Sequence, residues 1–394
     1  MSGTAHLLPQ HHSQASLETE LLLCSATVNL DAGGAERLRR LAHAAPDWER
    51  LLQIALAHRT MPLVYKHLST VCPELVPAPF MARLHDHFYL NAIRNKALNE
   101  ELCGVLRLLA ERDILAVPYK GPVLALEAYG DLSLRQFNDL DIMVRPQDVG
   151  RVAGVLKERG YEQQWQLTPA QEAAYLRSDC ERLFARDQGG LFLDLHWAFV
   201  RRYFSLRTDY ERLWRRLQPV SLGDCEAQSF APEDLLIILC VHAGKDLWER
   251  LIWIADVAQL LATHARLDWT QIFKEATTSG TRRMLLLGLC LAHDLLGSKL
   301  PEEVWHQAEA EPSVKALAAR VRRRLRENEA ASRSSLAEFL FHFRLHEGLK
   351  RKCSFTFRFA TTTNPADWAA ARLPDPLFFL YYFLRPLRLL IKRR

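Results

Sequence analysis

The sequence predicts a unit of helices and strands set between two helical regions. Before residue 113, apolar residues recur at helical spacing, as in Leu51, Leu52 and Ile54. Short apolar or alternating segments bounded by Pro and Gly follow, which are typical of strands, and helical spacing returns from Pro232. We therefore divide the chain into a disordered tail at 1–16, an N-terminal helical region at 17–113, a strand-containing core at 114–230 and a C-terminal helical region at 231–394.

The central core is expected to contain four strands. Residues 114–117 form an apolar run before Pro118, and residues 140–144 alternate before Arg145-Pro146. Residues 182–185 and 191–195 form a hairpin across Gly189-Gly190. Helices are predicted at 122–130, 147–159, 232–246, 248–264, 268–278, 281–296, 301–326 and 333–347.

Composition narrows the class of protein. Lys and Arg number 51 against 46 Asp and Glu, a net charge of +5, which suits nucleotides or other anionic substrates without requiring nucleic acid. The eight cysteines include no CxxC pair, so neither a zinc ribbon nor a disulfide framework is expected. The N-terminus lacks the basic and apolar segments of a signal peptide, and we expect a cytoplasmic protein.

Three acidic residues form the candidate catalytic and metal site. Asp139 and Asp141 are separated by one residue in a predicted strand, so both carboxylates lie on one face. Asp194 lies between two leucines in a later strand and is expected to complete the set. Converging carboxylates are the ligands that a two-metal site needs, with Mg²⁺ as the favoured ion and Mn²⁺ as an alternative.

Basic residues near these acids are candidates for holding a nucleoside triphosphate (NTP). Lys120-Gly121 lies at a predicted strand-to-helix turn, where anions are favoured, and Arg135 can bind a phosphate with two donors. Pro122 has no N–H to offer, so Lys120 or Arg135 is expected to supply the missing donor. His196 shares a strand face with Asp194 and contacts the nucleotide or acceptor, or else hydrogen-bonds a nearby loop.

The order of these motifs resembles the DNA polymerase β-like nucleotidyltransferase superfamily, and more closely its uncharacterised bacterial branch. The resemblance runs from about Trp48 to about Leu261. It is carried by Tyr119-Lys120-Gly121, Leu134-Arg135, Asn138-Asp139-Leu140-Asp141-Ile142-Met143-Val144, Gly160-Tyr161-Glu162 and Leu193-Asp194-Leu195-His196-Trp197.

The resemblance implies an α+β fold with a small mixed β-sheet and flanking helices as the nucleotidyltransferase core. It further implies Mg²⁺, an NTP as co-substrate, metal binding by Asp139 and Asp141, and activation of the acceptor hydroxyl by Asp194. The expected reaction moves a nucleoside monophosphate onto a hydroxyl of a small molecule, peptide or protein and releases pyrophosphate.

Two other functions remain open. The chain could be a catalytically degenerate nucleotide-binding or scaffold subunit of a biosynthetic or membrane-associated complex. An RNA-tailing enzyme is disfavoured, because the basic run 320–326 has no interleaved aromatic residues and is expected to be a solvated helix face.

The roles of three further sequence features are open to more than one interpretation. The aromatic run 377–384 and the basic residues after it are expected to form a docked helix, with peripheral membrane contact through 377–394 as the alternative. His242 is expected to be a core histidine. Asp256 needs a partner, for which His242, Lys245 and Arg250 are the candidates.

Overall fold

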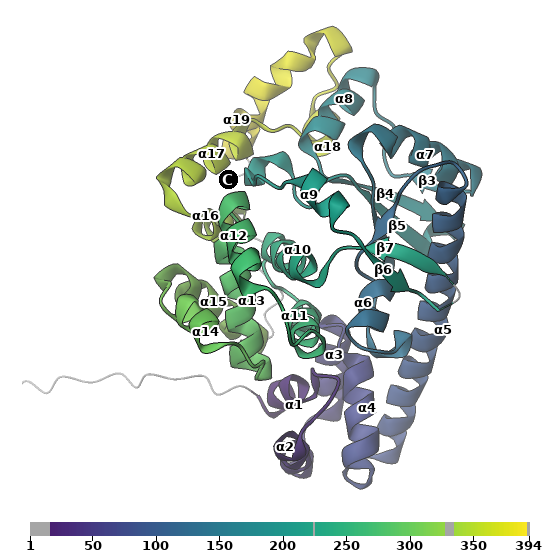
Figure 1. The fold of residues 1–394 in the computed structure, drawn as a ribbon, viewed down its shortest axis with the longest axis vertical. Coiled ribbons are helices and arrows are strands. Elements are labelled where there is room, and N and C mark those ends of the chain that lie inside the picture. Colours follow the sequence, from purple (N-terminus) through teal and green to yellow (C-terminus); the bar gives the residue numbers. More distant parts are fainter. Residues whose placement is uncertain (1–15, 224, 328–334, 392–394) are drawn as a thin grey trace, which may run out of the picture.

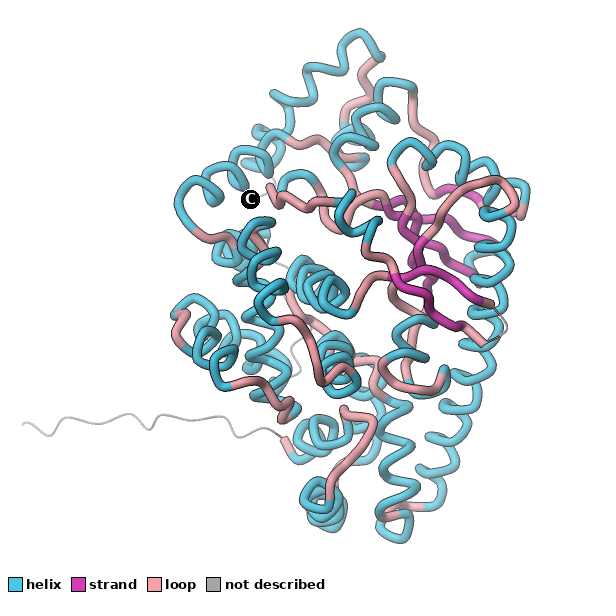
Figure 2. Tube along the Cα trace, in the orientation of Figure 1, coloured by secondary structure: helices cyan, strands magenta, loops and turns pink. Residues whose placement is uncertain are grey.

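The computed structural model describes residues 16–391 except residue 224 and residues 328–334. Its strands gather on one side of the molecule, and helices surround them (Figure 2). Residues 1–15 of the tail predicted at 1–16, and the basic residues 392–394, lie outside the described residues.

The N-terminal region is helical, as predicted. Its longest helix, α5, has 33 residues and runs along the sheet (Figure 1). The helices are α1 (Leu17–Ser25), α2 (Ala32–His43), α3 (Trp48–Ala57), α4 (Met61–Val71), η1 (Pro73–Leu75) and α5 (Ala78–Ala110).

A five-stranded mixed sheet forms the core, with the order β1-β2-β5-β4-β3. Strands β2 and β5 are parallel, and the other neighbours are antiparallel. This confirms the predicted α+β class and the hairpin across Gly189-Gly190. The strands are β1 (Val117–Pro118), β2 (Asp139–Met143), β3 (Glu162–Gln163), β4 (Glu181–Arg186) and β5 (Leu191–His196).

Several predicted boundaries in the core were wrong. The first strand, predicted at 114–117, is reduced to Val117–Pro118, because it is an edge strand that pairs with β2 at two positions only. A hairpin of β6 (Gln218–Ser221) and β7 (Glu226–Ser229) was missed, since both strands are short and polar. The connecting helices are α6 (Pro122–Glu127), η2 (Leu132–Leu134), η3 (Pro146–Asp148), α7 (Val149–Glu158), α8 (Pro169–Ser178), η4 (Asp187–Gly189), η5 (Arg202–Phe204) and α9 (Tyr210–Arg215).

The central strands have one apolar and one polar face. Leu140 and Ile142 of β2 are fully buried in a core that also contains Leu102 of α5 and Val152 of α7. Because side chains alternate along a strand, Asp139 and Asp141 of β2 lie on the opposite face. A second core unites N-terminal and C-terminal helices, so that these two regions pack together beside the sheet.

The C-terminal helices largely follow the predicted segments. The helix predicted at 301–326 is instead two, because Pro312 cannot continue the first and begins the second. The elements are α10 (Pro232–Lys245), α11 (Leu251–Thr263), α12 (Trp269–Ser279), α13 (Arg282–Leu296), α14 (Glu302–Glu309), α15 (Pro312–Glu327), α16 (Ser335–Leu345), α17 (Gly348–Thr361), α18 (Pro365–Ala370), η6 (Asp375–Leu380) and α19 (Tyr381–Ile391).

The last helix is tied to the body by ion pairs. Arg385 and Arg388 each donate to Asp367 of α18 at 2.6 Å, while the side chain of Phe383 is 69% exposed. Within the described chain, no helix combines the length and hydropathy needed to cross a bilayer. Peripheral membrane contact by this segment stays a prediction.

Close packing at Gly288 gives a first test of the helical core. A Cβ added there would lie 2.9 Å from the Trp248 ring and closer still to the sulfur of Cys240. We expect Gly288→Ala to lower the free energy of unfolding by about 1–3 kcal/mol, because the core must shift to admit a methyl group. Gly154→Ala on α7, where a Cβ would meet open space, should be neutral or stabilising by up to about 1 kcal/mol. Urea unfolding measures both, and equal stabilities would contradict the close packing.

Candidate active site

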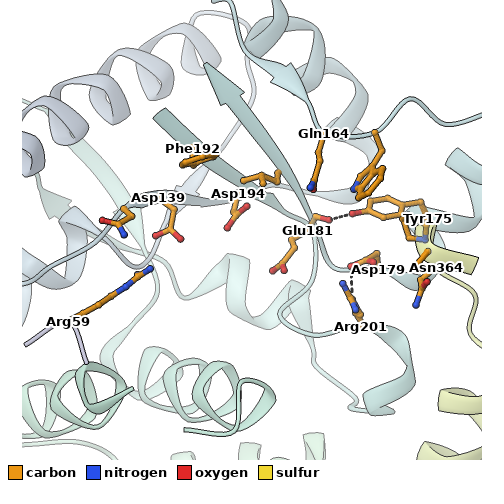
Figure 3. A pocket seen from close by; sticks show the side chains of 15 residues that line it. Arg59, Asp139, Gln164, Tyr175, Asp179, Glu181, Phe192, Asp194, Arg201 and Asn364 are labelled. Carbon is orange, nitrogen blue, oxygen red and sulfur yellow. Dashed lines mark hydrogen bonds and ion pairs between the residues drawn. The ribbon is translucent and has the colours of Figure 1, made fainter. Parts of the chain in front are cut away.

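Two parallel strands bring the acidic residues together. Asp141 of β2 lies directly opposite Asp194 of β5 in the register, and Asp139 is two residues earlier on the same face of β2. Figure 3 shows the carboxylates of Asp139 and Asp194 on one side of the sheet, together with that of Glu181 from β4. The backbone therefore concentrates four carboxylates at one place.

Asp141 is buried and paired with two nitrogen atoms. One carboxylate oxygen lies 2.5 Å from Lys120 Nζ and 3.0 Å from His196 Nε2. Burial opposes its charged form, but Lys120 and His196 outweigh that effect and hold the pKa of Asp141 well below its usual range. Asp141 is therefore a permanent anion in this site.

Asp194 has the opposite environment. Among the described residues its carboxylate has no hydrogen-bond or ion-pair partner. Burial and the neighbouring charge of Asp141 raise the pKa of Asp194 to about 7. Such a carboxylate is stabilised by any cation that reaches it.

The donor atoms fit a divalent ion. Ligand atoms of Asp141, Asp194 and His196 all lie within 4.8 Å of one another. Asp139 lines the same cavity and adds a further carboxylate. The carboxylate oxygens among these donors suit Mg²⁺ or Mn²⁺, and the unpartnered carboxylate of Asp194 favours binding of such an ion.

Glu181 and Lys245 are site residues that the sequence analysis missed. Glu181 accepts a hydrogen bond from Lys245 Nζ at 3.1 Å, and its carboxylate lies 3.3 Å from His196 Nδ1. Burial opposes the charged form of Glu181, yet Lys245, His196 and Lys120 lower its pKa to about 2. The signal for Glu181 was in the hairpin, whose register pairs Glu181 with His196.

Arg135 is bound by Asp256, which corrects the predicted partner of that acid. The two side chains form a buried bidentate pair with both N–O distances at 2.8 Å, and the Tyr129 hydroxyl donates to the same carboxylate at 2.8 Å. None of the expected partners, His242, Lys245 or Arg250, bonds to Asp256. The sequence pattern could not reveal this, because Arg135 and Asp256 belong to distant parts of the chain.

Two cavities meet at the acidic residues. The inner pocket, of about 210 Å³, reaches from Lys120-Gly121 to α10 and the start of α11. The outer pocket, of about 720 Å³, extends along β4 and β5 toward α8 and α18. Both are lined by Arg59, Asp139, Glu181 and Asp194.

Comparison with known families agrees with this geometry. A model of the family described as uncharacterised nucleotidyltransferase matches residues 44–297, which is more than half of the chain. The chain belongs to this nucleotidyltransferase family. No curated protein matches it.

The segment that the family model matches includes more than the sheet. It begins within the N-terminal helices and ends at the close of α13, so it contains both the acidic residues and the helices that border the inner pocket. The helices around the sheet are therefore part of what defines the family.

The turn at Lys120-Gly121-Pro122, which was predicted to hold phosphate, offers few donors. Gly121 adopts a left-handed φ of +49°, Pro122 has no N–H, and the amide of Val123 donates to the carbonyl of Lys120. The ammonium of Lys120 is bound to Asp141. Phosphate binding by Lys120, Gly121 or Arg135 stays a prediction.

Proposed function

We propose that this protein transfers a nucleoside monophosphate from an NTP to an acceptor hydroxyl and releases pyrophosphate. The observation that carries the proposal is the arrangement of Asp194, an unpartnered carboxylate directly opposite Asp141 and on the same face as Asp139. Family membership supports the class of reaction.

The chemistry follows from the positions of the carboxylates. The acceptor oxygen attacks the α-phosphorus, the bond from that phosphorus to the bridging oxygen of the β-phosphate breaks, and pyrophosphate leaves with the bond electrons. Asp194, opposite Asp141 and without a hydrogen-bond partner among the described residues, is placed to take the proton of the attacking hydroxyl. Asp139, Asp141 and Asp194 would hold Mg²⁺, which when bound supplies positive charge to the reacting phosphate and its leaving group.

The two cavities suggest separate places for donor and acceptor. The inner pocket adjoins Lys120-Gly121 and is lined by basic side chains as well as by the carboxylates, which suits a triphosphate bound together with a metal ion. The outer pocket is larger and lined by Trp165, Tyr175 and Phe192 together with polar side chains, which suits an organic acceptor. Asp194 lies where they meet, as an activating group between donor and acceptor must.

Asp139→Asn and Asp141→Asn provide the direct test. Each is expected to reduce transfer from an α-labelled NTP to below about 1% of the wild-type rate, because a metal-binding carboxylate is lost. Incubation with each NTP, Mg²⁺ and a cell extract, followed by mass spectrometry, identifies the nucleotide added. Asp86→Asn, at an exposed position on α5, is the matched control. Full activity in both site variants would refute the proposal.

One observation favours the alternative of a nucleotide-binding subunit without transfer. Lys120 already neutralises Asp141, and a metal ion must compete with this ammonium. Under the alternative, NTP and Mg²⁺ raise the melting temperature but no pyrophosphate appears. Metal-dependent stabilisation together with pyrophosphate release supports the enzyme instead.

A further inference from the structure

Five basic side chains line the inner pocket, and three of them are already paired. Lys120 binds Asp141, Arg135 binds Asp256, and Lys245 binds Glu181. Arg59 and Arg250 remain. Within the described part of the chain, neither guanidinium has a carboxylate oxygen within ion-pair distance.

Backbone hydrogen bonds hold Arg59 and Arg250 close together. Arg59 directly follows the C-cap of α3, His58, and Arg250 is the N-cap of α11. The carbonyl of His58 accepts from the amide of Ile252 at 3.2 Å, and His58 Nδ1 accepts from the amide of Leu251 at 3.3 Å. These bonds join the end of α3 to the beginning of α11, so two arginines distant in sequence are fixed at one side of the pocket.

The histidine in this junction is suited to accept a hydrogen bond. Burial, with the nearby charges of Arg324 and Arg250, lowers the pKa of His58 to about 4. His58 is therefore neutral near pH 7 and can offer Nδ1 as an acceptor. Protonation of His58 therefore does not disrupt the contact between α3 and α11 near pH 7.

Arg59 and Arg250 repel each other in this position. Burial and the charge of Arg250 both lower the pKa of Arg59, although Asp139 partly compensates. Figure 3 shows the guanidinium of Arg59 pointing toward Asp139, at the acidic edge of the pocket. Arg250 lies over the ring of Trp253, with its guanidinium carbon 5.6 Å from the ring centre. An anion with several oxygens would relieve the repulsion and bind both side chains.

We propose that Arg59 and Arg250 bind the β- and γ-phosphates of the NTP and then the pyrophosphate product. The assignment of the nucleotide rests on the proposed function, whereas the anion site itself requires only a polyphosphate. The α-phosphate must lie at Asp139 and Asp194 to react, and the basic side chains of the inner pocket favour that pocket for the β- and γ-phosphates. Pro122 offers no backbone donor at the turn that follows Lys120-Gly121, and two guanidinium groups from the flanking helices supply donors instead.

The proposed anion site gives the helical regions a role in nucleotide binding. Arg59 comes from the N-terminal helices and Arg250 from the C-terminal helices, and a bound triphosphate connects both to the sheet. Both residues lie within the segment matched by the family model. The nucleotide would therefore bind across three parts of the chain rather than on the sheet alone.

Binding of inorganic tripolyphosphate without divalent ions tests the anion site. Titration calorimetry in EDTA should show that Arg59→Met and Arg250→Met each weaken binding by about tenfold or more, since each removes a charge-assisted contact. The affinity of Arg59→Lys for tripolyphosphate should lie between those of the wild type and Arg59→Met, because lysine keeps the charge and loses the paired donors. Arg50→Met, at an exposed position on α3, is the control and should bind as the wild type does.

Failure of this inference differs from failure of the proposed function. Asp139→Asn is expected to lose transfer and still bind tripolyphosphate. Thermal unfolding first establishes that both methionine variants are folded. If transfer depends on Asp139 and both variants bind tripolyphosphate as the wild type does, the inference is wrong and the proposed function stands. If no NTP supports transfer while both methionine variants lose tripolyphosphate binding, the anion site is supported and the proposed function is not. A wild-type protein that does not bind tripolyphosphate also overturns the inference.

Discussion

Asp194→Asn is expected to abolish nucleotidyl transfer and to raise the melting temperature of the metal-free protein at about pH 8. The substitution keeps the shape of the side chain and removes a half-buried charge that faces Asp141 without a partner. Activity is lost because an amide neither takes the hydroxyl proton nor provides the negative charge that a metal requires. A gain in melting temperature of about 2 °C or more would be measured by thermal unfolding in EDTA.

The direction of the pH dependence follows from the raised pKa of Asp194. The pKa of this carboxyl is about 7 in the folded protein against an ordinary value of 3.8, so the folded state keeps the proton up to a higher pH than the unfolded chain does. Stability contributed by this group therefore falls as pH rises between these values and is constant above them. The melting-temperature difference between Asp194→Asn and wild type should widen from about pH 5 to about pH 8.

A matched control separates this effect from general changes in surface charge. Asp86→Asn removes an exposed carboxylate and should show the same melting temperature as wild type at both pH values. If Asp194→Asn lowers the melting temperature at both pH values, the charge of Asp194 is not destabilising in the metal-free protein. Addition of Mg²⁺ should stabilise the wild type and have little effect on Asp194→Asn.

Local sequence patterns predicted the acidic part of the site. Period-two alternation placed Asp139 and Asp141 on one face, and the Gly189-Gly190 hairpin aligned β4 with β5. Extending the same hairpin by one residue would also have revealed Glu181, because the register pairs it with His196. Strand geometry is local enough for such predictions to succeed.

The basic part of the site could not be predicted in the same way. Arg59 and Arg250 meet only because α3 and α11 dock through His58, and no periodicity in the sequence expresses that contact. Lys120 and Arg135 line the same pocket as the acids, but the identity of their partners depends on tertiary packing. Each forms an ion pair with an acidic residue in the structure.

Asp256→Leu is expected to destabilise the protein by about 3–5 kcal/mol, because it leaves the charge of Arg135 buried without a partner. The side chains of Asp256 and Arg135 are only 2% and 7% exposed. The Tyr129 hydroxyl loses its acceptor as well. Urea unfolding would measure the loss, and a change of less than about 1 kcal/mol would contradict the buried pair as a structural tie.

The double variant Arg135→Met/Asp256→Leu should recover most of this stability, since two apolar side chains replace two oppositely charged side chains of similar volume. It also separates the two roles considered for Arg135. Both Nε and Nη2 of Arg135 already donate to Asp256, so we expect the double variant to bind tripolyphosphate within about twofold of wild type, unlike Arg59→Met. If the refolded double variant binds about tenfold more weakly, Arg135 is a phosphate ligand as its position before the acidic pair predicts, and Asp256 is the residue that holds it in place.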